Sequence, residues 1–312
     1  TAAARGDLKA LWIMGEDILQ TDPNTCHVKS SLQGLDLLVV QELFMTETAR
    51  IADVIFPASS FLEKEGTFTN GERRIQKVQR AVEPLEGTKP DGQIVVDMMN
   101  RMGYPQKGYS ADVILKEIAG IVPFFKGVRW DELGNSGKQW PVREDGTDTQ
   151  ILHTETFKRG KGRFHSWDYD VSPELNENAS RFPYILTTGR LLEHYNSGTM
   201  TRRTPNSELV TEDILFVHPY DAGAKGLVSG DYARIFSARG ITTMKVKVTD
   251  VVKPGVIYTT FHFPEAAINF LTSGIGDEFT LTPEYKVVAV DFEKSQYGIF
   301  TRAECRTIIK TD

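Results

Sequence analysis

PYILTTGRLLEHYNSGTMTRR, residues 183–203, joins a short apolar run to a long polar loop. Residues 184–186 have the composition of a buried strand, and the polar residues begin at Thr187. Gly189 and Gly198 allow other groups to approach the backbone closely. The hydroxyl, amide, imidazole and guanidinium groups around them suit phosphates and polar rings. The stretch therefore predicts a strand that opens into a loop holding a large anionic cofactor. The alternative is an ordinary polar loop with a surface arginine pair.

Downstream of this stretch, short apolar runs recur at regular intervals and are broken by glycine and proline. They are ILFVHP (214–219), DYARIFSARG (231–240), ITTMKVKVTDVV (241–252), GVIYTTFHF (255–263) and KVVAVDFE (286–293). Many short strands at even spacing are typical of a β-sandwich or β-barrel. The sequence therefore predicts a β domain over residues 183–312.

Upstream, residues 1–125 have an α/β pattern. Continuous apolar runs at 8–15, 35–42 and 52–59 are typical of buried parallel strands. Ligands bind beyond the carboxyl ends of such strands, and all three ends are polar: Gly15-Glu16-Asp17, Gln41-Glu42 and Ser59-Ser60. The pattern predicts a ligand-binding half-domain, although ordinary loop chemistry would give the same residues.

Other elements follow from turn and helix signals. Residues 63–80 predict a hairpin with Asn70-Gly71 at its tip. Residues 91–103 and 110–120 predict helices, and Met98, Met99 and Met102 are expected in the core. Residues 126–182 are rich in turn formers and predict an irregular connection.

Composition excludes several classes of protein. The 312 residues are 40% hydrophobic and 25% charged, as in ordinary globular proteins. A net charge of −6 disfavours nonspecific nucleic-acid binding, and no apolar run reaches the roughly 18–20 residues of a membrane helix. Cys26 and Cys305 are too few for an iron–sulfur cluster or a disulfide framework. We expect a cytoplasmic protein, with the periplasm as the alternative.

Familiar catalytic motifs are missing. The sequence has no P-loop, no GxGxxG after a strand and no GxSxG elbow. Its six histidines lack metal-ligand spacing, and a histidine such as His262 in a strand is more often structural. Glu63 and Glu65 could serve as acid–base groups in a small-molecule enzyme, but their Glu-Lys-Glu-Gly setting favours a solvated loop.

Several strings, in order, resemble one family: the C-terminal part of the molybdenum- or tungsten-dependent formate dehydrogenase catalytic subunit, a molybdopterin oxidoreductase. The strings are MGED (14–17), VVQELFMTETARIADVIFPASSFLEKEGTFTNGERRIQ (39–76), TTGRLLEHYNSGTMTRR (187–203), HPYDAGAKGLVSGDYARIFSARG (218–240), NFLT (269–272) and PEYK (283–286). The resemblance implies a Rossmann-like parallel-sheet half-domain (1–125), an irregular connection (126–182) and a C-terminal β-barrel that binds the molybdopterin dinucleotide (183–312).

The resemblance also implies a cofactor and its ligands. The cofactor would be bis-molybdopterin guanine dinucleotide carrying Mo or W. Phe261 would lie near the substrate funnel. The first dinucleotide would be lined by Gly15, Asp17, Gln41, Glu42, Lys64 and Asp91. The pterin and phosphate parts would be held by Thr188, Gly189, Arg190, Leu191, His194, Tyr195, Asn196, Ser197, Asn269 and Lys286.

The chain also departs from the family. The family's four-cysteine [4Fe–4S] motif, its Cys or selenocysteine metal ligand and the neighbouring His and Arg are absent. We therefore expect a C-terminal piece without catalytic residues of its own, inactive alone. Its partners would be the N-terminal part of the same catalytic subunit, which would carry the [4Fe–4S] cluster, and iron–sulfur electron-transfer subunits, with formate as substrate. The alternatives are a portion of a nitrate- or arsenate-type enzyme and a cofactor-free structural relative.

Overall fold

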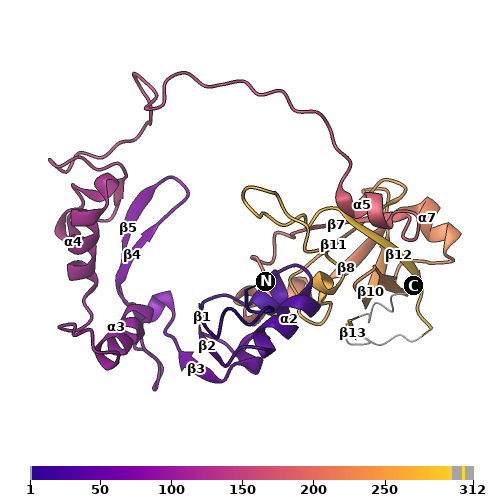
Figure 1. The fold of residues 1–312 in the computed structure, drawn as a ribbon, viewed down its shortest axis with the longest axis horizontal. Coiled ribbons are helices and arrows are strands. Elements are labelled where there is room, and N and C mark those ends of the chain that lie inside the picture. Colours follow the sequence, from indigo (N-terminus) through magenta and orange to yellow (C-terminus); the bar gives the residue numbers. More distant parts are fainter. Residues whose placement is uncertain (1, 297–303, 306–312) are drawn as a thin grey trace. The chain divides into compact units, whose positions relative to one another are not determined.

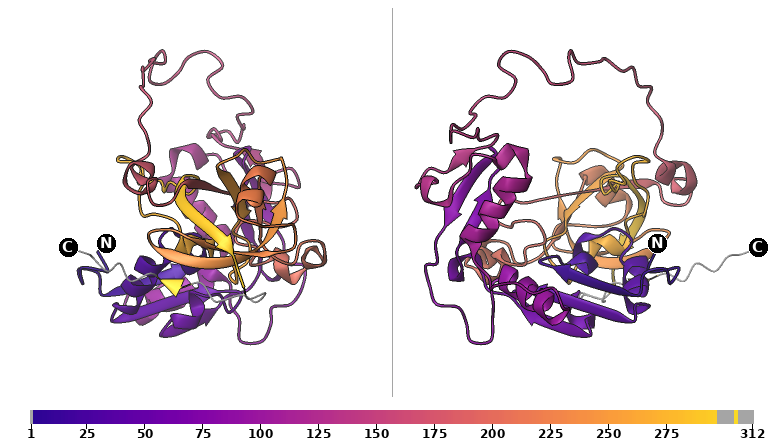
Figure 2. Two further views of the ribbon diagram at one scale, coloured as in Figure 1. Left: turned by 90° about the vertical axis from the view of Figure 1, so that its right-hand side faces the viewer. Right: turned by 60° about the vertical axis from the view of Figure 1, so that its left-hand side comes forward.

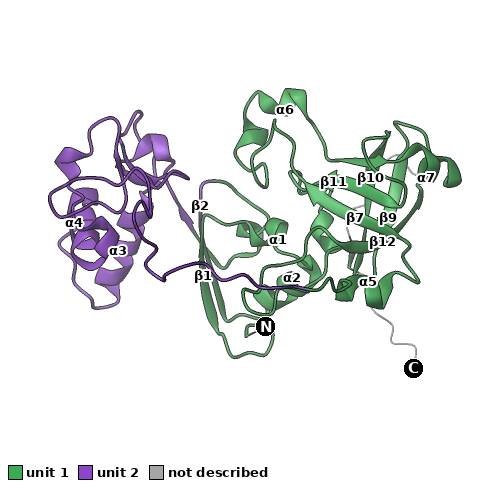
Figure 3. Cartoon of the chain, turned by 90° about the horizontal axis from the view of Figure 1, so that it is seen from above, with its two compact units in different colours: residues 1–40, 44–55, 168–312 green, residues 41–43, 56–167 purple. Residues whose placement is uncertain are grey.

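The computed structural model describes residues 2–296 and 304–305 and contains two compact units. Unit 1 comprises residues 1–40, 44–55 and 168–312, and unit 2 comprises residues 41–43 and 56–167 (Figure 3). The domain limits predicted from the sequence, at residues 125 and 182, stay predictions.

A three-stranded parallel sheet is formed near the N-terminus (Figure 1). Its strands, in order β1-β2-β3, are Ala10–Met14, Leu37–Glu42 and Val54–Pro57. Helices α1 (Ile18–Thr21) and α2 (Thr25–Gln33) follow β1, and the 3-10 turn η1 (Ala49–Ile51) precedes β3. The apolar runs supply the core, which contains Ile13, Leu32, Leu38, Val40 and Ala49. The predicted strand–helix–strand pattern is confirmed.

The C-terminal part of unit 1 is a closed barrel, visible in the turned views of Figure 2. The strand order is β13-β10-β8-β11-β7-β12-β9, and β9 pairs back with β10. The described strands are β7 (Tyr184–Gly189), β8 (Ile214–Val217), β9 (Tyr232–Phe236), β10 (Gly240–Val248), β11 (Val256–Thr260), β12 (Val288–Lys294) and β13 (Glu304–Cys305). Short helices α5 (Pro173–Asn178), α6 (Asn206–Leu209) and α7 (Pro219–Ala224), with 3-10 turns η5 (Thr201–Arg203) and η6 (Ile268–Phe270), complete it. This architecture confirms the predicted fold class.

Alternation along the barrel strands explains the closure. Leu186 of β7, Leu215 of β8 and Ile257 of β11 are fully buried in one core cluster, with Ile235 and Phe292 from β9 and β12. Successive side chains of a strand point to opposite faces, so one apolar face per strand fills the interior. β7 runs parallel to β11 and antiparallel to β12. The strand that enters the polar loop is therefore central and held on both sides.

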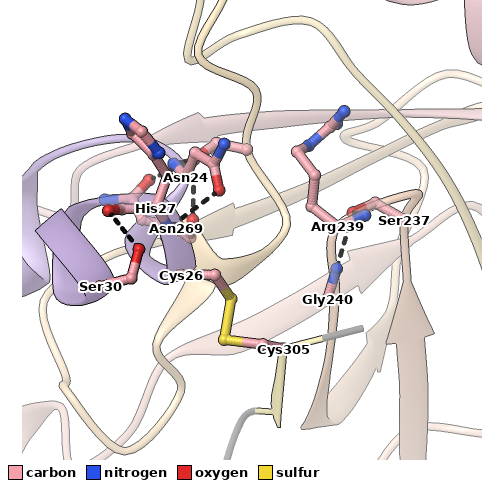
Figure 4. Close-up of a disulfide and its surroundings, with 10 residues drawn as sticks. Asn24, Cys26, His27, Ser30, Ser237, Arg239, Gly240, Asn269 and Cys305 are labelled. Atoms are coloured by element: carbon pink, nitrogen blue, oxygen red, sulfur yellow. Dashed lines mark hydrogen bonds between the residues drawn. A yellow bond between two sulfur atoms is a disulfide. The ribbon is translucent and has the colours of Figure 1, made fainter. Parts of the chain in front are cut away.

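The two cysteines pair with each other, which the sequence did not predict. Cys26 in α2 and Cys305 in β13 form a disulfide, although they are 279 residues apart (Figure 4). Two cysteines at such separation gave no pairing signal, because only the fold brings α2 and the barrel edge together. The bridge fastens the N-terminal half-domain to the barrel within unit 1.

Unit 2 is a smaller α+β body. Strands β4 (Gly66–Thr69), β5 (Arg74–Val78) and β6 (Lys138–Gln139) form a sheet, and the predicted hairpin is confirmed. Helices α3 (Asp91–Arg101) and α4 (Ala111–Ile121) accompany the 3-10 turns η2 (Phe61–Glu63), η3 (Pro123–Phe125) and η4 (Trp130–Glu132). The core contains Ile75, Leu115, Val128, Leu133 and Val142.

The expectation for the methionines was wrong in part. Met102 lies just after the last residue of α3 and is 78% exposed. The buried side chains of α3 are Ile94 and Val96. A helix cap often faces outward, so the 3.6-residue period stops predicting burial at this position.

The predicted irregular connection contains β6 and α5, but residues 140–172 have no helix or strand (Figures 1 and 2). Among the helices of the described residues, none is long and apolar enough to cross a membrane.

Candidate functional site

The polar loop starts where β7 ends, and its first residues are held from the C-terminal side. The Thr188 hydroxyl donates to the Tyr285 carbonyl oxygen at 3.0 Å. The Lys286 Nζ donates to the Thr188 carbonyl oxygen at 2.5 Å. The structure therefore brings Lys286 to the start of the loop, beside Thr188, which was predicted with it.

Gly189 is required at its position by a close neighbour. A Cβ added there would lie 2.4 Å from the hydroxyl oxygen of Tyr258. That hydroxyl in turn donates to the Arg190 carbonyl oxygen at 3.1 Å. The glycine thus lets a tyrosine from β11 fix the first turn of the loop.

His262 binds the loop at two points. The Leu191 backbone N–H donates to its Nε2 at 3.0 Å, and its Nδ1 lies 2.6 Å from the Asn196 carbonyl oxygen. One nitrogen accepts and the other donates, so the ring is the neutral Nδ1–H tautomer. Burial lowers the pKa of His262, which favours the same neutral form. His262 lies two residues after β11 and not within a strand, as the sequence had suggested, and its ring holds the loop.

Arg190 and Phe261 form the outer part of the loop. The Arg190 guanidinium lies 5.2 Å from the centre of the Phe261 ring and donates to the Asn196 side-chain oxygen at 3.3 Å. Arg190 is exposed, and so is Tyr195. A solvent-facing guanidinium over an aromatic ring can bind a phosphate or another anion.

Other predicted loop residues face inward. His194 is buried, and its ring nitrogens lie 3.0 Å from the Thr201 hydroxyl and 2.9 Å from the Val210 carbonyl oxygen. The Ser197 hydroxyl lies 2.9 Å from that of Thr199. Burial lowers the pKa of Arg202. These groups shape the loop from within.

Gln20 joins the half-domain to this loop, and the sequence analysis missed it. Its side-chain nitrogen donates to the Ser197 carbonyl oxygen at 2.9 Å and to the Phe261 carbonyl oxygen at 3.1 Å. Its Oε1 is buried and has no partner among the described residues. The sequence did contain a signal: Gln20 follows the apolar pair Ile18-Leu19. A polar side chain buried beside apolar residues needs hydrogen-bond partners, which marks it as a candidate contact residue.

Of the two predicted residues at the end of β1, Asp17 is hydrogen-bonded within the protein and Gly15 is not in close contact with other groups. Gly15 has φ +65°, and an added Cβ would meet nothing within 4 Å. The Asp17 carboxylate is buried and accepts from the Thr48 N–H at 2.9 Å and from the Thr48 hydroxyl at 2.7 Å. Asp17 therefore fixes the turn that precedes β3.

In unit 2 the structure brings together three of the predicted dinucleotide residues. The fully buried Gln41 donates from its side chain to one Asp91 oxygen at 2.7 Å, and Lys64 pairs with the other oxygen. Glu42, predicted with them, accepts from the Leu43 N–H at 2.7 Å. Asp91 is the first residue of α3 and Lys64 follows η2, so the hairpin and α3 position the pair.

This cluster has open bonding capacity. The Gln41 Oε1 is buried without a partner among the described residues. Each Asp91 oxygen uses one protein donor, whereas a carboxylate oxygen can accept two hydrogen bonds. Lys64 and Asp91 also line a cavity of about 310 Å³. The donor and acceptor set fits a polar ring carrying both N–H and carbonyl groups.

Glu63 does not have the properties of a catalytic base. Its carboxylate accepts backbone N–H bonds from Ser60 at 2.7 Å and from Leu85 at 2.8 Å. Those bonds hold the pKa of Glu63 below its usual value. The residue caps η2, which gives Glu63 a structural role, whereas the role of Glu65 stays a prediction. No cluster of three or more His, Cys, Asp or Glu that could hold a metal occurs among the described residues.

Comparisons with known protein families agree with this geometry. Residues 1–101 match the family model "Molybdopterin oxidoreductase", and residues 184–289 match "Molydopterin dinucleotide binding domain". The first match covers the parallel sheet and Lys64 and Asp91, and the second covers most of the barrel and the polar loop.

Curated relatives are substantially longer than this chain. The F420-dependent formate dehydrogenase subunit alpha of Methanocaldococcus jannaschii is 40% identical over 294 residues, covering 92% of this chain and 43% of the relative. The Bacillus subtilis "Probable oxidoreductase YjgC" is 38% identical over 291 residues, covering 92% of this chain and 29% of the relative. The chain thus spans less than half the length of these relatives.

A solved structure supports the fold. Acetylene hydratase from Pelobacter acetylenicus superimposes with a TM-score of 0.70 at 19% identity, covering 92% of this chain and 44% of that protein.

Proposed function

Because the chain belongs to the molybdopterin oxidoreductase family, we propose that it forms the cofactor-binding C-terminal portion of a formate dehydrogenase. The substrate assignment draws on the 40% identity to a subunit named as an F420-dependent formate dehydrogenase. The whole enzyme would oxidise formate to carbon dioxide and pass two electrons to iron–sulfur partners. The N-terminal part of the subunit would supply the [4Fe–4S] cluster and the metal ligand.

One observation carries the proposal. In unit 2, Lys64 and Asp91 pair at the wall of a cavity of about 310 Å³, and each Asp91 oxygen accepts from one protein donor although it can accept two hydrogen bonds. A ligand bearing two adjacent N–H donors would use this remaining capacity of the carboxylate. The guanine of a molybdopterin guanine dinucleotide offers such donors beside a carbonyl acceptor.

In unit 1 the residues of the polar loop have a second role. We assign Arg190, exposed over Phe261, to the anionic part of the cofactor, and Lys286 and His194 to holding the loop in the shape that receives it. When bound, the cofactor, carrying Mo or W, supplies the redox chemistry. The protein's share is orientation and charge compensation.

The test is cofactor retention. The chain would be co-produced with the unmatched N-terminal part of the M. jannaschii subunit, and pterin, metal and GMP released by acid hydrolysis would be quantified. Lys64→Met and Lys286→Met are expected to lower pterin and GMP content, because the first removes the cation at the cavity and the second removes the hydrogen bond that holds the start of the loop.

Lys253→Met serves as the matched control, since Lys253 is exposed and lies outside both sites. Unchanged pterin and GMP content in both site variants would contradict the assignment. If the cofactor-loaded complex reduces nitrate but does not oxidise formate, the assignment of the cofactor site stands and the assignment of formate as substrate is contradicted.

A further inference from the structure

The cavity in unit 2 has two kinds of wall. Apolar side chains come from β4, β5 and α4, and among them are Phe68, Val78, Ile114 and Ile118. Polar groups come from Lys64, Glu65 and Asp91. At about 310 Å³ the cavity is at the lower end of the volumes typical of small-molecule sites. Such a cavity suits a flat ring with one polar edge.

Tyr109 lines the same cavity and is packed on the start of α3. A Cβ added to Gly92 would lie 2.2 Å from the ring carbon Cε2 of Tyr109. The ring therefore lies directly on the backbone of the first turn of α3, next to Asp91. Only a residue without a Cβ leaves room for it there.

The hydroxyl of Tyr109 is free to bind a ligand. None of the hydrogen bonds described for residues 2–296 uses it. Burial, together with the negative charges of Glu65 and Asp91, raises the pKa of Tyr109. At neutral pH the phenol therefore stays protonated, and it can both donate and accept.

We propose that Tyr109 is an aromatic wall of a purine pocket, where its ring contributes to the affinity for the base, while Asp91 and Lys64 form the polar edge that selects guanine. The inference rests on the proposed function, and it adds a contact residue that the polar cluster alone does not identify.

The polar edge favours guanine over adenine. Guanine presents two adjacent N–H donors, which a carboxylate accepts as a pair, and a carbonyl oxygen, which an ammonium group can reach. Adenine presents an amino group where guanine has that carbonyl, so Lys64 would face a donor. An aromatic side chain stacks on guanine and on adenine alike, because both bases present a flat π face. Removing the Tyr109 ring should therefore weaken both purines, whereas changing Lys64 should mainly weaken guanine.

The experiment measures binding of GDP and ADP to the 312-residue chain by titration calorimetry. We expect wild type to bind GDP more tightly than ADP. Tyr109→Ala should weaken GDP binding about tenfold to a hundredfold, the loss typical of a stacked aromatic side chain. Tyr109→Phe should keep most of the affinity because it keeps the ring. Tyr104→Ala is the matched control, since Tyr104 is 64% exposed and does not line the cavity.

The outcomes separate the two proposals. If wild type binds GDP, Lys64→Met weakens it and Tyr109→Ala does not, the role of Tyr109 is overturned while the guanine site stands. If wild type binds neither nucleotide, the guanine site fails and the Tyr109 inference fails with it. Should Tyr109→Ala not fold, as judged by circular dichroism, Tyr109→Leu fills the same space without an aromatic ring and gives the same comparison.

Discussion

The side-chain amide of Asn269 donates a hydrogen bond to the backbone oxygen of Gln20 at 2.7 Å. The same nitrogen reaches the Thr21 oxygen at 3.1 Å. Both acceptors lie at the end of α1, where helix carbonyls lack intrahelical partners. Asn269 was predicted to bind the cofactor, and that role stays a prediction. Its two hydrogen bonds join the barrel of unit 1 to the end of α1 in the N-terminal half-domain.

Replacing Asn269 should therefore destabilise the protein even without cofactor. Asn269→Ala removes a buried side-chain amide, so the carbonyl oxygens of Gln20 and Thr21 each lose the hydrogen bond that it donates. We expect the free energy of unfolding to fall by about 1–3 kcal/mol, measured by urea denaturation. Asn135→Ala, at an exposed position, is the control. Equal stability of the Asn269 and Asn135 variants would show that the contact contributes nothing.

Tyr285 should make the stability of unit 1 depend on pH in the alkaline range. Its hydroxyl donates to the Thr21 carbonyl oxygen at 3.0 Å, and burial raises its pKa to about 12. An unfolded tyrosine titrates near pH 10. Between these values the unfolded state has lost a proton that the folded state keeps, so this contribution is present below about pH 10 and is lost as the pH rises toward 12.

The measurement compares melting temperatures of wild type and Tyr285→Phe from pH 8 to 12. The wild type should be the more stable at pH 8, and its advantage should shrink above pH 10. A difference that is constant across the whole range would mean that Tyr285 does not titrate differently in the folded protein.

The sequence predicted the elements better than it predicted what each site residue does. Continuous apolar runs such as 35–42 have the length of buried strands, and the Asn70-Gly71 turn identified a hairpin. By contrast, the contacts of Asp17 with Thr48, of Gln20 with Ser197 and of Cys26 with Cys305 join residues far apart in the chain. No local pattern reports such pairs, because they depend on the tertiary arrangement.

The same limit applies within the polar loop. Residue types in 188–197 correctly indicated many hydrogen-bond groups, but could not separate Arg190, which faces solvent, from His194, which binds the loop itself. Which of these residues touch the cofactor therefore stays a prediction.

Gly198 should be among the least replaceable residues of the polar loop. Its φ is +70°, and an added Cβ would lie 2.7 Å from the His262 carbonyl oxygen. Gly198→Ala therefore combines left-handed strain with a backbone clash, and we expect a loss of about 2–3 kcal/mol in the free energy of unfolding. Gly223→Ala is the control, because Gly223 lies in α7 and an added Cβ meets nothing within 4 Å.

The control should be neutral or more stable by about 0.5–1 kcal/mol, since alanine is the better helix former. Limited proteolysis should also cut residues 190–203 faster in Gly198→Ala than in wild type. Equal cutting rates together with unchanged stability would contradict the constraint on Gly198.

The Cys26–Cys305 bridge should stabilise unit 1 by restricting its unfolded chain. It closes a loop with a sequence separation of 279 residues and ties α2 to β13, which pairs with β10 at Gly240. Reduction, or Cys26→Ser, is expected to lower the free energy of unfolding by about 2–4 kcal/mol. Cys305→Ser should give the same loss, and the double variant no more than either single one, because all three remove one bond. Iodoacetamide labelling followed by intact mass measurement checks the premise: the native protein should take up no label until a reductant is added. Labelling of both cysteines in unreduced, folded protein would show that the bridge is not formed.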